Sequence, residues 1–185
     1  MPVCEARPMT ADAPAPPRFA DPRRTGALIG LAGAAVFVFS YTSSGAAALV
    51  VRAGVVALIA ATLWFLFVRP RGLGRFAPPT RVGIAVYLAC VVGELALIAV
   101  GTRLLEEAGA GALRPALIAL VVGLHFLPFA WAFHERMFAL LGGLLVVLGG
   151  IGLLTGAAEA MAVASGVVMA GLLLGYSLGG FARRG

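Results

Sequence analysis

The dominant pattern in the chain is a series of long apolar stretches separated by short polar or proline-containing segments. Residues 27–68 and 137–183 are each about twice the roughly 20 residues that one helical crossing of a bilayer needs. Each stretch must therefore turn once, at 41–45 (YTSSG) and at 155–159 (TGAAE), where small and polar residues gather. The pattern predicts an all-α integral membrane protein, a bundle of six transmembrane helices at about 27–41, 46–68, 82–100, 115–133, 137–154 and 160–181.

The composition agrees with this class. The chain is 61% hydrophobic and 12% charged, whereas a typical soluble domain is about 45–50% apolar and about 25% charged. All fourteen basic residues are arginines, which together with the richness in alanine and glycine suggests a high-GC bacterial gene. Cys4 and Cys90 fall in the leading segment and inside a predicted helix, so we expect no disulfide between them.

The first 25 residues differ from the rest, because they hold six of the eleven prolines and carry charges of both signs. They predict a disordered Pro-rich cytoplasmic tail (1–25), followed by a six-span membrane domain over 26–185. The pair Arg23-Arg24 before an apolar run also resembles a twin-arginine export signal. The residues after it, Thr25-Gly26-Ala27, are small where that signal has bulky apolar ones, so we expect the first span to be retained rather than cleaved.

The arginines predict an orientation. Six spans place both termini on one side, and eleven arginines fall in the tail, the second and fourth loops and the C-terminus, against Arg103 and Arg114 on the other side. By the positive-inside rule both termini are cytoplasmic, in a bacterial inner membrane. Arginines placed between apolar spans indicate the orientation of a membrane protein, so we expect no nucleic-acid partner. The expected partner is the lipid bilayer, with anionic lipid at Arg69, Arg71, Arg75 and Arg81.

Glycine spacing predicts how the helices pack. Small residues allow close approach of helix backbones in a bilayer, where the hydrophobic effect contributes little. Gly171, Gly175 and Gly179 recur every four residues, and Gly142 and Gly149 lie seven residues apart, so each set is expected on one helix face. We interpret these faces as packing inside the bundle, in preference to a seam with another membrane protein or with a second copy.

Three ionisable residues, Arg52, Glu94 and His125, fall inside the predicted spans. At about 1.5 Å per residue they lie within about 6 Å of one level on three helices, which makes them a candidate intramembrane polar site. Tyr87 shares the face of Glu94, and Pro128 cannot donate a hydrogen bond to the carbonyl of residue 124, which leaves an acceptor beside His125. The cluster is either a structural clasp or a functional site, because polar groups inside a membrane are costly unless paired.

The segment around His125 reads VGLHFLPFA over residues 122–130. It resembles uncharacterised small multi-spanning membrane proteins of high-GC bacteria that carry a similar G-L-H-F-L-P element. The resemblance covers this span and the general plan of the chain, and it implies no known activity.

Three function classes remain. The chain has no sequence signature of a nucleophile with its base, of a metal site or of a phosphate-binding loop, so we expect no metal, no cofactor and no enzymatic activity. An accessory or scaffold protein of the membrane is the first interpretation. A small transporter or proton-coupled permease that uses the Arg, Glu and His cluster is the alternative. An intramembrane enzyme acting on a lipid with His125 as general base has the least support, because no nucleophile accompanies the histidine.

Overall fold

The computed structural model describes residues 19, 21–73 and 80–182. Over these residues the chain forms helices and no strands, in the order α1 (Pro22–Tyr41), α2 (Ala46–Leu63), the π-helix η1 (Trp64–Val68), α3 (Arg81–Glu107), the 3₁₀ turn η2 (Gly111–Leu113), α4 (Arg114–Ala132), α5 (Arg136–Thr155) and α6 (Ala158–Ser177). Six helical segments are long and apolar enough to cross a membrane, the second being α2 with η1 and the fourth η2 with α4. The predicted all-helical chain with six such segments is confirmed.

Helix α1 begins earlier than expected, inside the segment predicted as a tail. Asp21 is its N-cap and accepts a hydrogen bond from the backbone N–H of Arg23 at 3.0 Å, and Pro22 occupies the first helical position. Both residues favour a helix start, because an N-cap carboxylate satisfies a free N–H and proline needs no donor there. Residues 1–18 and 20 of the predicted tail lie outside the described residues.

Helices α3 and α6 also end away from the expected positions. Helix α3 runs on to Glu107, past the predicted end near residue 100, and its last turn carries an ion pair between Arg103 and Glu107 at 2.8 Å. Helix α6 ends at Ser177 rather than near residue 181. Gly179 follows it with a φ of +81°, a left-handed conformation that glycine adopts without strain and that commonly ends helices.

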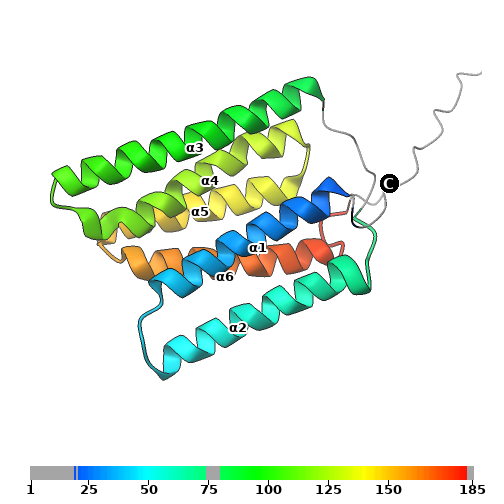
Figure 1. The fold of residues 1–185 in the computed structure, drawn as a ribbon, viewed down its shortest axis with the longest axis horizontal. Coiled ribbons are helices and arrows are strands. Elements are labelled where there is room, and N and C mark those ends of the chain that lie inside the picture. Colours follow the sequence, from blue (N-terminus) through cyan, green and yellow to red (C-terminus); the bar gives the residue numbers. More distant parts are fainter. Residues whose placement is uncertain (1–18, 20, 74–79, 183–185) are drawn as a thin grey trace, which may run out of the picture.

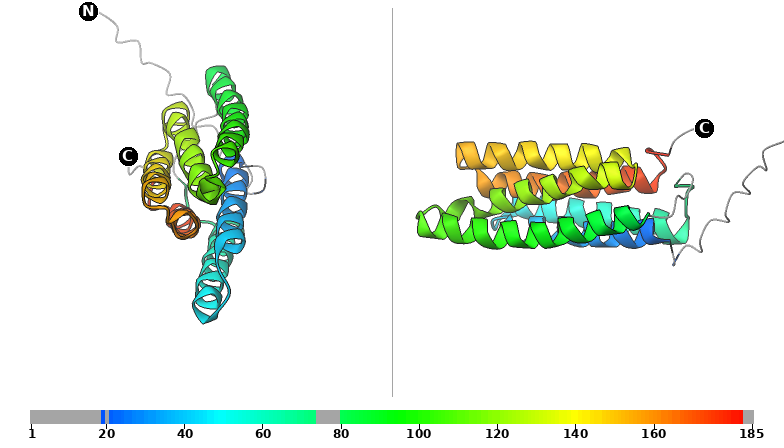
Figure 2. Two further views of the ribbon diagram at one scale, coloured as in Figure 1. Left: turned by 90° about the vertical axis from the view of Figure 1, so that its left-hand side faces the viewer. Right: turned by 90° about the horizontal axis from the view of Figure 1, so that it is seen from above.

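The helices run up and down the bundle, roughly parallel to one another, so that successive connections lie at alternate ends (Figures 1 and 2). At one end lie the start of α1, the segment after η1, the starts of α3 and α5 and the end of α6. We call this the basic end, because six described arginines lie there against two acids: Arg23, Arg24, Arg69, Arg71, Arg81 and Arg136, with Asp21 and Glu135. The opposite end carries the turns at 42–45, 108–113 and 156–157.

Helices α2 and α3 occupy the two edges of the bundle, while α1, α4, α5 and α6 lie between them (Figures 1 and 2). Fewer residues are buried in α3 than in α2 with η1, and the buried residues of α3 are Gly83 and Thr102. Eight of its large aliphatic side chains are between 48% and 66% exposed: Val82, Ile84, Leu88, Val92, Leu95, Leu97, Val100 and Leu104. An apolar surface this extensive is typical of a face that meets lipid or another protein.

Close contact between α4 and α5 depends on glycine. A Cβ atom built on Gly149 would lie 2.5 Å from the backbone nitrogen of Leu120, and one on Gly142 would lie 2.8 Å from the carbonyl oxygen of Gly123. Gly123 makes the reciprocal approach from α4. By contrast, Gly143 and Gly150, each the second glycine of its pair, face open space. The predicted face of Gly142 and Gly149 thus lies against α4, where side chains larger than hydrogen do not fit.

The glycine face expected on the sixth helix differs from the structure. Gly171 faces open space, and Gly179 lies beyond the end of α6 in its left-handed turn. A Cβ on Gly175 would make an ordinary contact of 3.7 Å with Phe181. The close approach of α6 to α1 comes instead at Gly166, where a Cβ would lie 2.8 Å from the carbonyl oxygen of Ala34. The spacing of four residues therefore did not identify the glycine at which α6 packs closely against α1, which is Gly166.

Candidate functional site

Glu94 and His125 form a polar pair between α3 and α4. Glu94 lies midway along α3, and His125 lies in the second half of α4. The carboxylate Oε2 of Glu94 is in direct contact with Nδ1 of His125, as a hydrogen-bonded pair. Such a contact holds one proton between an imidazole nitrogen and a carboxylate oxygen. The two side chains are 18% and 12% exposed respectively, so the pair is largely covered without being sealed.

An aromatic cluster surrounds the imidazole. The His125 ring lies 4.8 Å from the Phe126 ring and 4.5 Å from the Phe129 ring, measured between centroids. Phe129 in turn packs against Tyr87 of α3 at 5.4 Å and against Phe138 of α5 at 5.8 Å. These rings limit the access of water, and a low local dielectric strengthens a satisfied polar pair. Tyr87 therefore belongs to the surroundings of the pair through its ring.

Pro128 lies one turn from His125 without interrupting the helix. Helix α4 continues from Arg114 to Ala132 with Pro128 inside it. Because proline has no N–H, the carbonyl of Leu124 lacks its ordinary helical donor, as the sequence indicated. This carbonyl is adjacent in sequence to His125, and Leu124 is an exposed residue.

Arg52 does not join Glu94 and His125. It lies on α2, at the edge of the bundle opposite to α3 (Figure 1). Its Nη2 donates a hydrogen bond to the carbonyl oxygen of Thr42 at 2.8 Å, and its guanidinium lies 5.8 Å from the centre of the Phe39 ring. Thr42 is the C-cap of α1, so Arg52 places its charge at the negative end of that helix. The three residues predicted to meet are therefore separated in the structure. Glu94 and His125 form a pair, and Arg52 caps the end of α1.

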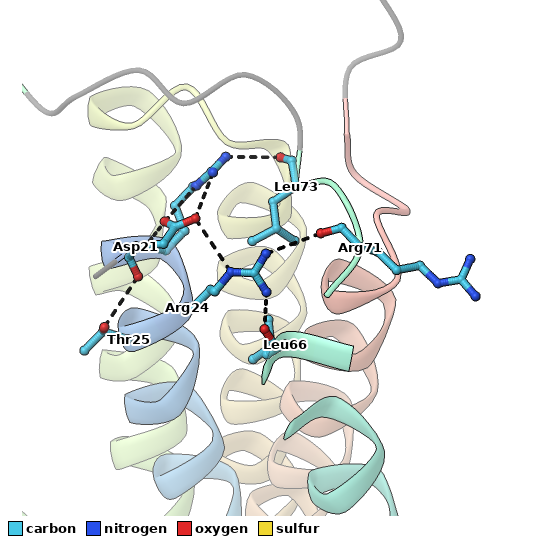
Figure 3. Close-up of polar contacts among 7 residues, drawn as sticks. Asp21, Arg24, Thr25, Leu66, Arg71 and Leu73 are labelled. Carbon is cyan, nitrogen blue, oxygen red and sulfur yellow. Dashed lines mark hydrogen bonds and ion pairs between the residues drawn. The ribbon is translucent and has the colours of Figure 1, made fainter. Parts of the chain in front are cut away.

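The structure reveals a second polar cluster, at the basic end, that the sequence interpretation missed (Figure 3). Asp21 and Arg24 are 3% and 8% exposed. Asp21 forms an ion pair with Arg23 at 2.9 Å and a longer one with Arg24 at 3.8 Å. All three residues fall in the segment that we expected to be disordered. Their local pattern, an acid, a proline and then an apolar run, is nevertheless a helix-start signal.

Arg24 joins the start of α1 to the end of the second apolar segment. Its guanidinium donates to the carbonyl of Leu66 in the π-helix η1 and, at 3.4 Å, to the carbonyl of Arg71 (Figure 3). Helix C-termini leave carbonyl groups without donors, and a buried guanidinium both satisfies them and suits the negative end of the helix dipole. The same interaction fixes the segment that follows η1.

One segment of the chain is similar to a known protein family. Residues 110–179 match a family of unknown function (DUF7010). The matched segment begins just before η2 and ends just after α6, so it contains the α4–α5 glycine contacts and His125, while Glu94 and the cluster around Arg24 lie outside it. The similarity therefore concerns a unit of three consecutive helices. No curated protein and no solved structure matches the chain.

Glu94 and His125 are two proton-binding groups in hydrogen-bonded contact. Within the described ranges no group of three or more His, Cys, Asp and Glu side chains is placed to hold a metal ion. Cys90, on the same helix as Glu94, is a free cysteine. One carboxylate and one imidazole in contact can hold or exchange a proton, and they can fasten two helices together.

Proposed function

We propose that the protein is a multi-pass protein of a bacterial inner membrane with a non-enzymatic accessory or scaffold role, in which the Glu94–His125 pair acts as a clasp that fastens α3 to α4. The observation that carries the proposal is the direct contact of these two side chains. Nδ1 of His125 and Oε2 of Glu94 are engaged with each other, which supports a structural use of the pair.

The weak packing of α3 supports a clasp. The outward apolar side chains of α3 do not favour association with α4 in a membrane, because lipid tails are as apolar as leucine. At the end of α3, Glu106 and Arg114 lie 3.7 Å apart, but their side chains are more than half exposed, and exposed pairs contribute little. An interhelical polar pair contributes about 0.6–1.7 kcal/mol by double-mutant cycles in membrane proteins. The pair therefore adds to the ring contact between Tyr87 and Phe129 in holding α3 against α4.

The charge distribution supports the orientation. The basic end, with its six arginines against two acids, corresponds to the cytoplasmic side under the positive-inside rule. The start of α1 and the end of α6 both lie at this end (Figure 1), which supports the proposal that both termini are inside. The exposed faces of α2 and α3 are then covered by lipid, and an accessory role adds another membrane protein or a second copy as partner.

A double-mutant cycle tests the clasp. We expect Glu94→Gln and His125→Ala each to lower the free energy of unfolding in mixed detergent micelles, with a coupling energy of about 0.6–1.7 kcal/mol between them. Leu95→Ala is the matched control, because its side chain is on the next residue of α3 and is 64% exposed. It should show coupling to His125→Ala below about 0.5 kcal/mol. Coupling for Glu94 no larger than that of the control would refute the clasp.

A small transporter or proton-coupled permease is the second candidate, favoured by the central position of Glu94 along α3 and by the incomplete burial of the pair. In this mechanism the pair binds and releases a proton during transport. Proton flux into proteoliposomes under an imposed voltage, reported by an enclosed pH-sensitive dye, separates the two candidates. Flux in the wild type and in Leu95→Ala that disappears in Glu94→Gln would favour transport. Absence of flux, or flux that persists in Glu94→Gln, would remove the pair from a transport mechanism.

A further inference from the structure

Two exposed arginines, Arg69 and Arg71, follow the π-helix η1 at the basic end. The guanidinium of Arg71 lies 5.6 Å from the centre of the Phe65 ring, and Figure 3 shows it pointing away from the buried cluster around Arg24. Trp64, in the same helical turn as Phe65, is 49% exposed. Arg71 and Phe65 therefore lie together where α2 ends, and an exposed tryptophan is in the same turn.

The backbone that carries these arginines is fixed at several points. The carbonyl of Arg71 accepts a hydrogen bond from Arg24, and the carbonyl of Leu73 accepts one from Arg23 at 3.3 Å. The N–H of Arg69 donates to the carbonyl of Trp64 at 2.9 Å, and the side chain of Leu73 is buried. A segment held in this way loses little conformational freedom when it binds a ligand, which favours affinity.

The charges of the two arginines are not neutralised by acids in the part of the chain that the structure describes. The nearby carboxylate of Asp21 is engaged by Arg23 and Arg24. At the opposite end the situation differs, since Arg103 and Arg114 lie within 4 Å of Glu107 and Glu106. Two exposed guanidinium groups at the end of η1 are therefore available to an external anion.

We propose that Arg69 and Arg71, with Phe65 and Trp64 beside them, bind the headgroup phosphate of an anionic phospholipid. Guanidinium groups bind phosphate oxygens through paired hydrogen bonds, and aromatic side chains favour the level of the headgroups. The exposed apolar side chains of Val68 and Leu63 continue along the same helix and provide a surface for an acyl chain. This site is independent of the clasp, and it requires only that the second apolar segment spans a bilayer.

The site is narrower than the basic loop predicted from the sequence. Arg81 begins α3, on the other side of the basic end from the end of α2 (Figure 1). Arg75 lies outside the described residues. The proposal therefore rests on Arg69 and Arg71.

Lipid titration of the purified full-length protein in neutral detergent tests the site. Trp131→Phe provides the background, because Trp64 is then the sole tryptophan and its fluorescence is quenched by a lipid with brominated chains. The lipids are phosphatidylglycerol and phosphatidylcholine with the same chains. The variant is Arg69→Gln with Arg71→Gln, and the matched control is Arg103→Gln with Arg114→Gln, which removes the same charge at the opposite end.

We expect tighter binding of phosphatidylglycerol than of phosphatidylcholine, and a loss of roughly twenty- to thirtyfold in phosphatidylglycerol affinity for the Arg69 and Arg71 variant, the contribution of two arginines at a membrane surface. The control variant should keep the wild-type preference. Both altered arginines are exposed, so the glutamine variant without lipid should keep the thermal midpoint of the wild type. A second variant, Arg69→Lys with Arg71→Lys, retains the charge and should retain part of the preference for phosphatidylglycerol. Equal quenching by the two lipids, or an equal loss in both glutamine variants, would overturn the proposal. Full displacement of the lipid by inorganic phosphate at matched ionic strength would assign the site to free phosphate instead.

Discussion

The glycine contacts between α4 and α5 allow a sharp prediction, because α5 contains two neighbouring glycines with opposite surroundings. A Cβ at Gly149 would lie 2.5 Å from the backbone nitrogen of Leu120 and 2.8 Å from the carbonyl oxygen of Ala116, whereas nothing lies within 4 Å of one at Gly150. Ordinary contact begins at 3.4 Å. The backbone of α4 must therefore move by about 1 Å to admit a methyl group at Gly149, and such overpacking costs about 1–3 kcal/mol.

Gly149→Ala and Gly150→Ala form a matched pair for this test. Replacement of glycine by alanine favours a helix by about 1 kcal/mol, and this gain is shared by the two variants. The difference between their free energies of unfolding therefore isolates the contact with α4. We expect Gly149→Ala to be less stable than Gly150→Ala by about 1–3 kcal/mol, measured by equilibrium unfolding in mixed micelles of a mild detergent and sodium dodecyl sulfate, followed by circular dichroism.

The refuting result is equally clear. If the two alanine variants unfold within about 0.5 kcal/mol of each other, α4 and α5 do not approach as closely as the structure has them. A substitution that shortens a side chain at this interface would not test the closeness of the two backbones, because it removes contacts and adds no group that must fit between the helices.

Two further predictions concern the basic end. Arg24→Gln should lower the free energy of unfolding by about 1.5–3 kcal/mol, because it removes charged hydrogen bonds to the carbonyls of Leu66 and Arg71. The exposed control Arg69→Gln should stay within about 0.5 kcal/mol of the wild type. Equal effects of the two substitutions would contradict a role for Arg24 in joining α1 to η1. An alkaline phosphatase that is active only in the periplasm should be inactive when fused after Gly185 and active when inserted at the turn at 156–157, and the reverse pattern would overturn the proposed orientation.

Position along a helix was predictable from residue counts, whereas position around the bundle was not. The rise per residue placed Glu94 and His125 at one level, and the structure has them in contact. The same argument placed Arg52 at that level, yet Arg52 binds the end of α1 on the far side of the bundle. Residue counts contain no information on the order in which helices are arranged, so a shared depth is necessary for contact and insufficient for it.

Glycine spacing had a similar limit. Gly142 and Gly149 lie against α4 as a common face requires, but Gly171 shows the same kind of spacing and faces open space. A pattern on one helix indicates which residues share a face, and the neighbour that meets this face is set by the remaining helices. Asp21 and Arg24 were missed for a different reason: averaged composition marked their segment as a tail, while the local N-cap signal pointed to a helix start.

The length of α3 has a consequence for the bilayers that would suit this protein. Its 27 residues extend about 40 Å, roughly 10 Å more than the hydrocarbon thickness of a typical membrane. The last turn of α3 suits a position outside the hydrocarbon, because Arg103 and Glu107 are exposed there and paired with each other. Because most of the surface of α3 is exposed, a change in the tilt of this helix would adapt it to a thicker or thinner membrane, while the glycine-packed helices α4 and α5 keep their separation. Tolerance of hydrophobic mismatch would then reside in one helix at the edge of the bundle.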